Sequence, residues 1–165
     1  MSANTQTPRA PVLGADSINL LERLSNAVAV SGDEGEIRAI VLEQVKPLAD
    51  EVKVDALGNV LATRKARGDG ALRVMLAAHM DEVGFMLVDE EEGGLYRFAT
   101  VGGIDVRQLA GKPVWVGKQH VPGMIGARPI HLTTREERAH SIPLDQLRID
   151  LGPGGKAKVG DRATF

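Results

Sequence analysis

Cysteine is absent from this sequence of 165 residues, which excludes a disulfide framework and a metal site built from thiolates. Any bound metal ion would therefore need His, Asp or Glu as its ligands. Long apolar runs are also absent: none approaches the roughly 20 residues that cross a bilayer. Residues 1–14 lack the apolar core of a signal peptide. We therefore expect a cytoplasmic protein without a membrane partner.

Neither sign of charge dominates the sequence. It has 20 Lys and Arg against 22 Asp and Glu, a net charge of -2, and no basic block. This balance offers no electrostatic surface for nucleic acid, so we expect no nucleic-acid partner. Aromatic residues make up only 3% of the chain, so a small independent domain would have a thin core. The hydrophobic content of 43% is ordinary for a globular protein.

Residues 16–83 have the mixed patterning of an α/β domain, and we expect residues 1–15 before them to form a flexible tail. Ser31 and Glu34 have the spacing of a capping box, which predicts that a helix begins there. An earlier helix, with Asp16 or Ser17 as its cap, is predicted by apolar residues at helical spacing: Ile18, Leu20, Leu21, Leu24, Ala27 and Val28.

After the second predicted helix, the apolar residues alternate with a period of two. Val52 and Val54 alternate with charged residues, residues 55–59 form a predicted turn, and residues 60–64 return as a second strand. Residues 72–78 (LRVMLAA) contain an uninterrupted run of apolar or small residues, which is typical of a strand buried on both faces of a sheet.

Residues 84–162 show short β-like runs that are separated by glycine-rich turns about every 8 to 12 positions. Only residues 133–139 indicate a further helix. The pattern predicts a second, β-rich module that forms a small barrel or sandwich.

The sharpest local feature is His79-x-Asp81, which follows the predicted buried strand. Open α/β sheets place their ligand sites at the carboxyl ends of strands. One imidazole nitrogen can bind a metal ion while a nearby carboxylate fixes the tautomer of the ring. A catalytic zinc site needs at least three protein ligands, and no neighbouring residue supplies the others. From spacing alone, a surface or core His–Asp pair is therefore the alternative to a metal site.

The other candidate residues have simpler explanations. His120, His131 and His140 share no ligand spacing, and the acidic run at residues 89–92 suits the solvated tip of a hairpin. The glycine pairs lack the Lys and Ser/Thr of a phosphate-binding loop. Composition and spacing therefore indicate an α/β part followed by a β module, and leave metal binding open.

Several segments carry a family resemblance when they are taken together and in order. They are LLERLSNAVAVSGDEG (residues 20–35), DALGN (55–59), AAHMDEVG (77–84), VGGID (101–105), VPGMIGARPIHL (121–132), IDLG (149–152) and VGD (159–161). This combination resembles the glutamyl aminopeptidase and tetrahedral aminopeptidase family of metallopeptidases, some members of which are named endoglucanase.

The resemblance implies a metal-dependent aminopeptidase with two zinc or cobalt ions. His79 matches the family's metal-binding histidine, and Asp81 matches the catalytic acid that positions it. The implied fold is α/β: residues 16–83 are the amino-terminal part of an α/β/α catalytic domain, and residues 84–162 are an inserted, barrel-like dimerisation domain. Residues 163–165 then begin the return to the catalytic domain. The implied partners are peptide substrates and further copies of the chain, from dimers to twelve-subunit shells.

The family's other metal ligands and its catalytic Glu lie beyond the part that this sequence matches. We therefore expect a truncated chain that is inactive alone. The alternative is an interaction module that uses its β domain to bind full-length subunits. A different hydrolase that shares only His-x-Asp is disfavoured, because the segments at residues 101–105 and 121–132 resemble the inserted domain and carry no general hydrolase chemistry.

Overall fold

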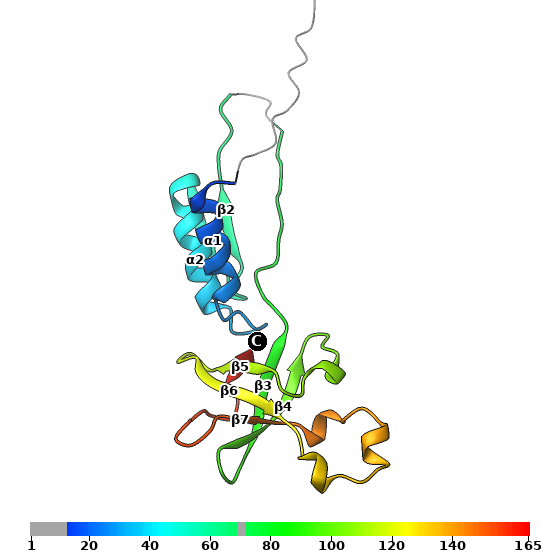
Figure 1. Cartoon of the computed structure of the whole chain (residues 1–165). Helices are drawn as coiled ribbons and strands as arrows, with labels where there is room; N and C mark the ends of the chain where they lie inside the picture. The colour runs from blue at the N-terminus through cyan, green and yellow to red at the C-terminus, as the bar shows by residue number, and fades with distance from the viewer. Residues whose placement is uncertain (1–12, 69–71) are drawn as a thin grey trace, which may run out of the picture.

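The structure is a computed structural model that describes residues 13–68 and 72–165. The chain forms an elongated amino-terminal part, which contains helices and a hairpin, and a small barrel built from the rest of the chain (Figure 1). Most of the predicted tail at residues 1–15 lies outside the described residues. None of the helices in the described ranges is long and apolar enough to cross a membrane.

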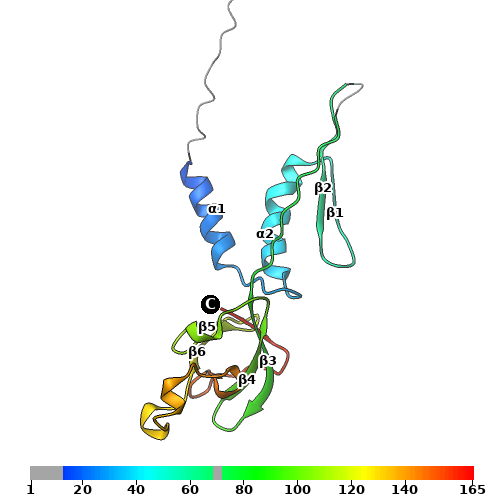
Figure 2. The same ribbon diagram turned by 90° about the vertical axis from the view of Figure 1, so that its right-hand side faces the viewer.

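Helices α1 (Ala15–Asn26) and α2 (Gly35–Val45) confirm the two predicted helices. Helix α1 begins after Gly14, which has an extended backbone and no capping side chain, so the predicted cap at Asp16 or Ser17 is wrong. Figure 2 shows α2 standing between α1 and the hairpin. An exposed ion pair of 2.5 Å between Arg23 and Glu43 joins the two helices, and exposed pairs of this kind stabilise only weakly. A short 3-10 turn, Lys46–Leu48, follows α2.

The predicted capping box at Ser31 and Glu34 is wrong. Neither side chain caps α2, which begins one residue after Glu34. The amide of Asp33 instead donates to the carbonyl of Val30 at 2.8 Å, which closes a tight turn in which Gly32 has φ +86°. A glycine at the positive-φ position is what such a turn requires. In this turn the Glu34 carboxylate accepts a hydrogen bond of 2.5 Å from the amide of Gly32, instead of from an amide of the helix.

The predicted hairpin is confirmed as strands β1 (Glu51–Val54) and β2 (Val60–Thr63), which pair antiparallel. Its turn is held by the Asp55 carboxylate, which accepts from the amides of Leu57 and Asn59 at 2.9 Å each. An aspartate that bonds to amides following it is a common way to fix such a turn.

The buried strand predicted at residues 72–78 is wrong for this chain. The segment is part of an extended connector, residues 72–82, which runs from the hairpin toward the barrel (Figure 1) and pairs with no strand within the described residues. Leu72 and Leu76 are 90% and 94% exposed. Residues 13–68 and 72–165 provide no neighbouring strand and no covering helix for this apolar run, so its β pattern has no sheet to join.

The glycine-rich turns between short β runs predicted a small barrel or sandwich, and the structure shows the barrel. Six antiparallel strands close in the order β3-β4-β7-β6-β5-β8. Their bounds are β3 Gly84–Glu91, β4 Leu95–Val101, β5 Pro113–Val116, β6 Val121–Gly126, β7 Arg148–Asp150 and β8 Arg162–Thr164. The helix predicted at residues 133–139 is reduced to a 3-10 turn, Glu137–Ala139. Further 3-10 turns are Val106–Gln108, Ile130–Leu132 and Leu144–Gln146.

The barrel has its own hydrophobic core, in which three of the chain's few aromatic side chains are buried. Phe85 meets Phe98 edge to face, with ring centroids 5.1 Å apart, an arrangement that aromatic pairs favour. The buried set is Phe85, Leu87, Tyr96, Phe98, Leu109, Val114, Val116, Ile125, Leu147, Ile149, Leu151 and Ala163. A smaller cluster of Ala27, Ala29 and Ile37 lies in the amino-terminal part.

The two parts meet where the loop before α2 runs beside the start of β3. Val30 and Glu82 form an isolated parallel bridge, in which Glu82 donates its amide to Ala29 at 2.8 Å. The fully buried side chain of Val30 packs over Gly84. This junction brings the residues around position 31 against the residues around position 81, and it therefore builds the surroundings of the His-x-Asp segment.

Candidate active site

His79 and Asp81 lie at the end of the connector, just before the junction with the barrel. The ring nitrogen Nδ1 of His79 lies 3.0 Å from the backbone oxygen of Asp81 and 3.3 Å from its carboxylate Oδ1. Both partners are acceptors, so in the neutral ring the proton resides on Nδ1 and the lone pair on Nε2. The His79 side chain is 86% exposed, which leaves Nε2 accessible to a ligand.

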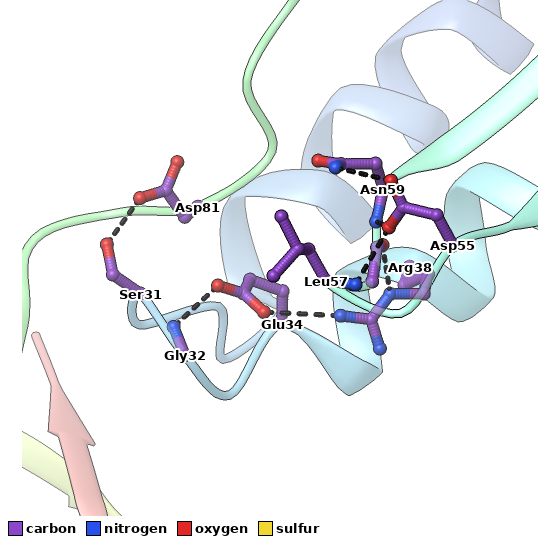
Figure 3. Close-up of polar contacts among 9 residues, drawn as sticks. Ser31, Gly32, Glu34, Arg38, Asp55, Leu57, Asn59 and Asp81 are labelled. Atoms are coloured by element: carbon purple, nitrogen blue, oxygen red, sulfur yellow. Dashed lines mark hydrogen bonds and ion pairs between the residues drawn. The ribbon is translucent and has the colours of Figure 1, made fainter.

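The carboxylate of Asp81 has a second partner. Its Oδ2 accepts a hydrogen bond from the hydroxyl of Ser31, which lies 50 residues earlier in the sequence (Figure 3). The pKa of the Asp81 carboxyl is lowered from its usual value, mainly because Ser31 donates to it and further because His79 faces it. Asp81 is therefore a charged, oriented group near neutral pH.

An open groove of about 550 Å³ runs past these residues. One wall is the hairpin together with Glu34 and with Val41 of α2, and the other is the connector. The groove is lined by Glu34, Val41, Asp55, Leu57, Gly58, Asn59, Val60, Leu61, and by residues 75–81. A hollow of about 660 Å³ in the loop between β6 and β7 is larger. It contains neither His79 nor Asp81, so we assign the candidate site to the groove.

A polar network holds the hairpin turn against α2 along the groove (Figure 3). Arg38 donates from Nε to the carbonyl of Gly58 at 2.7 Å and from Nη2 to the Glu34 carboxylate at 3.2 Å. Gly58 has φ +89°, and a Cβ there would lie 2.4 Å from the Arg38 guanidinium. The glycine of the DALGN segment therefore allows the positive φ and leaves room for the Arg38 side chain.

The sequence-predicted site residues are only partly brought together. Within the described ranges, no group of three or more His, Cys, Asp or Glu side chains is placed to hold a metal ion. His120 pairs instead with Glu36 at 2.9 Å, across the junction between the barrel and α2. His140 lines the loop hollow. His79 fits the role of one metal ligand, and the described part of the chain does not complete a site around it.

Sequence reasoning missed Ser31 as a partner of Asp81. It assigned the Ser31 hydroxyl to a helix cap, because Glu34 stands three residues later. No local signal connects two residues that are 50 positions apart, since the contact depends on the parallel bridge between the loop and the connector.

Comparison with known proteins places this chain in a family. A sequence model described as M42 glutamyl aminopeptidase matches residues 58–162. The lysyl aminopeptidase of Pyrococcus furiosus is 33% identical over 144 residues, which are 85% of this chain and 41% of that protein. A TET aminopeptidase of a marine-sediment Thaumarchaeota archaeon has a solved structure that superposes with a TM-score of 0.80 at 35% identity. That match covers 90% of this chain and 44% of the other.

A further solved structure is the TET1 peptidase of Pyrococcus horikoshii, described as able to assemble into a tetrahedron or a large octahedral shell. It matches with a TM-score of 0.76 at 35% identity, over 90% of this chain and 46% of the other. The chain thus shares the fold of the amino-terminal portion of these aminopeptidase chains. It belongs to the M42 glutamyl aminopeptidase family. It spans less than half the length of the curated relatives that it matches.

Proposed function

We propose that this chain is the amino-terminal part of a metal-dependent aminopeptidase, to which it contributes part of an α/β/α catalytic domain and the barrel. The observation that carries the proposal is the His79–Asp81 pair on an open groove, in a chain of this family. The Nδ1 atom of His79 faces Asp81, and its Nε2 atom faces outward. This is the arrangement in which a carboxylate orients a metal-binding imidazole.

His79 would bind one of two divalent ions, zinc or cobalt, through Nε2, and Asp81 would hold the ring in place. Bound ions of this kind polarise a peptide carbonyl and lower the pKa of a bound water molecule. The described residues offer no group of three ligands. In this proposal the remaining ligands belong to the part of the aminopeptidase that this chain does not cover, so the chain by itself does not hydrolyse peptides.

Metal binding by the isolated chain tests whether its own residues complete a metal site. Titration calorimetry with zinc and with cobalt is done on the chain and on His79→Ala. We expect weak or absent binding in both, because one imidazole cannot hold the ion alone. Tight binding that His79→Ala abolishes would contradict the proposal, since it would mean that the chain completes a site by itself.

Activity is tested in a chimera in which this chain replaces the matching part of the Pyrococcus furiosus lysyl aminopeptidase. The chimera should release an amino acid from aminoacyl anilides. His79→Ala should lower the rate by at least about a hundredfold, because removing a ligand costs no less than removing a residue that supports one. His140→Ala, in the loop hollow, is the matched control. Equal activity of both variants would exclude His79 from the site.

The alternative function, an interaction module, is favoured by a different observation. The barrel closes on its own core, and the outer face of its β5–β6 hairpin carries exposed apolar side chains. Pro113 stands opposite Met124 and Trp115 opposite Pro122, and Trp115 and Met124 are each about half exposed. We propose that this face binds further copies of the chain, as expected for a family with a member described as a shell-forming assembly.

A further inference from the structure

The Asp81 carboxylate has a different partner at each of its two oxygens. Oδ2 of Asp81 accepts from the Ser31 hydroxyl, while Oδ1 lies 3.3 Å from Nδ1 of His79 (Figure 3 shows the Ser31 side). An aspartate carboxylate can rotate about its last side-chain bond. The hydrogen bond from Ser31 to Oδ2 opposes that rotation, so Oδ1 stays directed at the imidazole.

Ser31 is itself held firmly in place. Its amide donates to the carbonyl of Glu82 at 3.3 Å, and the residue before it, Val30, is fully buried. The residue after it, Gly32, has the positive φ of the tight turn. The hydroxyl is therefore carried on a rigid turn rather than on a mobile loop, and the turn aims it at the connector.

From this geometry we propose that Ser31 is a positioning residue, which acts through Asp81 to set the tautomer and orientation of His79. The proposal rests on the proposed function, because the purpose of the fixed tautomer is to present Nε2 to a metal ion. It extends that function to a residue in the SGDEG segment, 48 positions before His79. Ser31 touches neither the imidazole nor any reacting atom, so its effect requires the Asp81 carboxylate.

The test is made on the metal-free chain, by measuring the ring ¹⁵N shifts of His79, which report the ratio of the two neutral tautomers. A double-mutant cycle compares Ser31→Ala, Asp81→Ala and the combined variant. The backbone oxygen of Asp81, which also faces Nδ1, is present in every member of the cycle, so its contribution cancels. Ser31→Thr keeps the hydroxyl. Ser31→Val has the same shape as the Thr variant but lacks the hydroxyl, so the comparison of these two variants controls for folding and shape.

Ser31→Ala should shift the tautomer ratio toward the Nε2-protonated form by about twofold to tenfold, the effect of one hydrogen bond. The same substitution should have no effect once Asp81 is Ala. Ser31→Thr should keep the original ratio, and Ser31→Val should behave as Ser31→Ala. An equal shift in both backgrounds, or no shift at all, would overturn the proposal. Because no metal is present, this failure is separate from that of the aminopeptidase proposal, which the chimera measures.

Discussion

Thr164 donates a hydrogen bond of 2.7 Å from its hydroxyl to the Glu82 carboxylate. The same oxygen of Glu82 accepts from the amide of Ala29 at 3.4 Å. One carboxylate oxygen thus joins the last strand of the barrel, the connector and the loop before α2. Because Glu82 directly follows Asp81, this contact also fixes the backbone next to the candidate site.

Replacing Thr164 by Val removes the hydroxyl and keeps the shape of the side chain. Thr164 is only 4% exposed, and the substitution leaves a partly buried carboxylate oxygen of Glu82 with a weaker partner. We expect the free energy of unfolding to fall by about 1–3 kcal/mol, measured by chemical denaturation. Thr63→Val on the exposed face of β2 is the matched control and should change it by less than about 0.5 kcal/mol. Equal effects would mean that the junction bond does not stabilise the fold.

Gly84, at the end of the AAHMDEVG segment, is a packing position. A Cβ there would lie 2.5 Å from Val30 Cγ2 and 2.6 Å from the carbonyl oxygen of Ala163. Gly84→Ala should therefore push the amino-terminal part away from the barrel and lower stability by about 1–3 kcal/mol. Thermal unfolding followed by circular dichroism measures the loss.

Gly103 provides the control for Gly84, since it belongs to the VGGID segment and a Cβ there meets nothing within 4 Å. Its φ is not in the left-handed region. Gly103→Ala should leave the unfolding temperature unchanged or raise it slightly, because alanine reduces the freedom of the unfolded chain. A loss as large as that of Gly84→Ala would show that the effect is not steric.

Local patterns in the sequence predicted the two amino-terminal helices, the hairpin and the barrel correctly, because each follows from the spacing of apolar residues and turn residues nearby. The Asp55 turn and the closed barrel are examples. The contacts that build the site could not be predicted from local patterns. Ser31 meets Asp81 only because a parallel bridge aligns two distant segments. The local pattern instead predicted that Ser31 caps a helix.

The predicted buried strand at residues 72–78 failed for a different reason. Its apolar run is a property of the sequence alone, whereas burial requires neighbours. The described residues supply a hairpin on one side of the groove and no strand that pairs with the connector. A pattern can therefore predict that a segment is suited to a sheet without predicting that this chain provides the sheet.

Asp105 gives a prediction for the dependence on pH. Its pKa is lowered from 3.8 to about 2, first because the Arg107 side chain donates to it and then because the Arg107 amide does. A lowered pKa in the folded state stabilises the fold above the unfolded pKa, and this contribution is lost as the pH falls through about 2. A carboxyl ¹³C titration of Asp105 should show its midpoint near 2.

Variants of Arg107 separate the two causes of that shift. Arg107→Gln should raise the Asp105 midpoint toward 3.8, since the charged guanidinium is removed while the backbone amide of residue 107 still donates. Arg107→Lys keeps the charge but loses the two-pronged geometry, so its midpoint should lie between those of the other two proteins. Identical midpoints in all three would show that the backbone amide alone is responsible.

The exposed connector predicts self-association of the isolated chain. Leu72, Val74 and Leu76 are each at least 79% exposed on an unpaired, extended segment, which is a ready edge for another chain. The double substitution of Leu72→Lys and Leu76→Lys should increase the monomer fraction in analytical ultracentrifugation. Leu13→Lys with Leu48→Lys adds the same charge at other exposed leucines and should have a much smaller effect. A wild-type chain that is monomeric at high concentration would contradict this prediction.

The outer face of the β5–β6 hairpin predicts a second, specific contact, which is best measured with the connector already substituted by lysines. Trp115 is the sole tryptophan and is 48% exposed in the single chain, so its burial in an oligomer should shift its emission to shorter wavelengths as concentration rises. Met124→Lys should weaken this association by at least about tenfold, as the loss of a central interface side chain does. Val88→Lys, on an exposed position of β3, should not weaken it. If Met124→Lys and Val88→Lys act equally, the copies of the chain meet through another surface, and the barrel's apolar hairpin is not the interface.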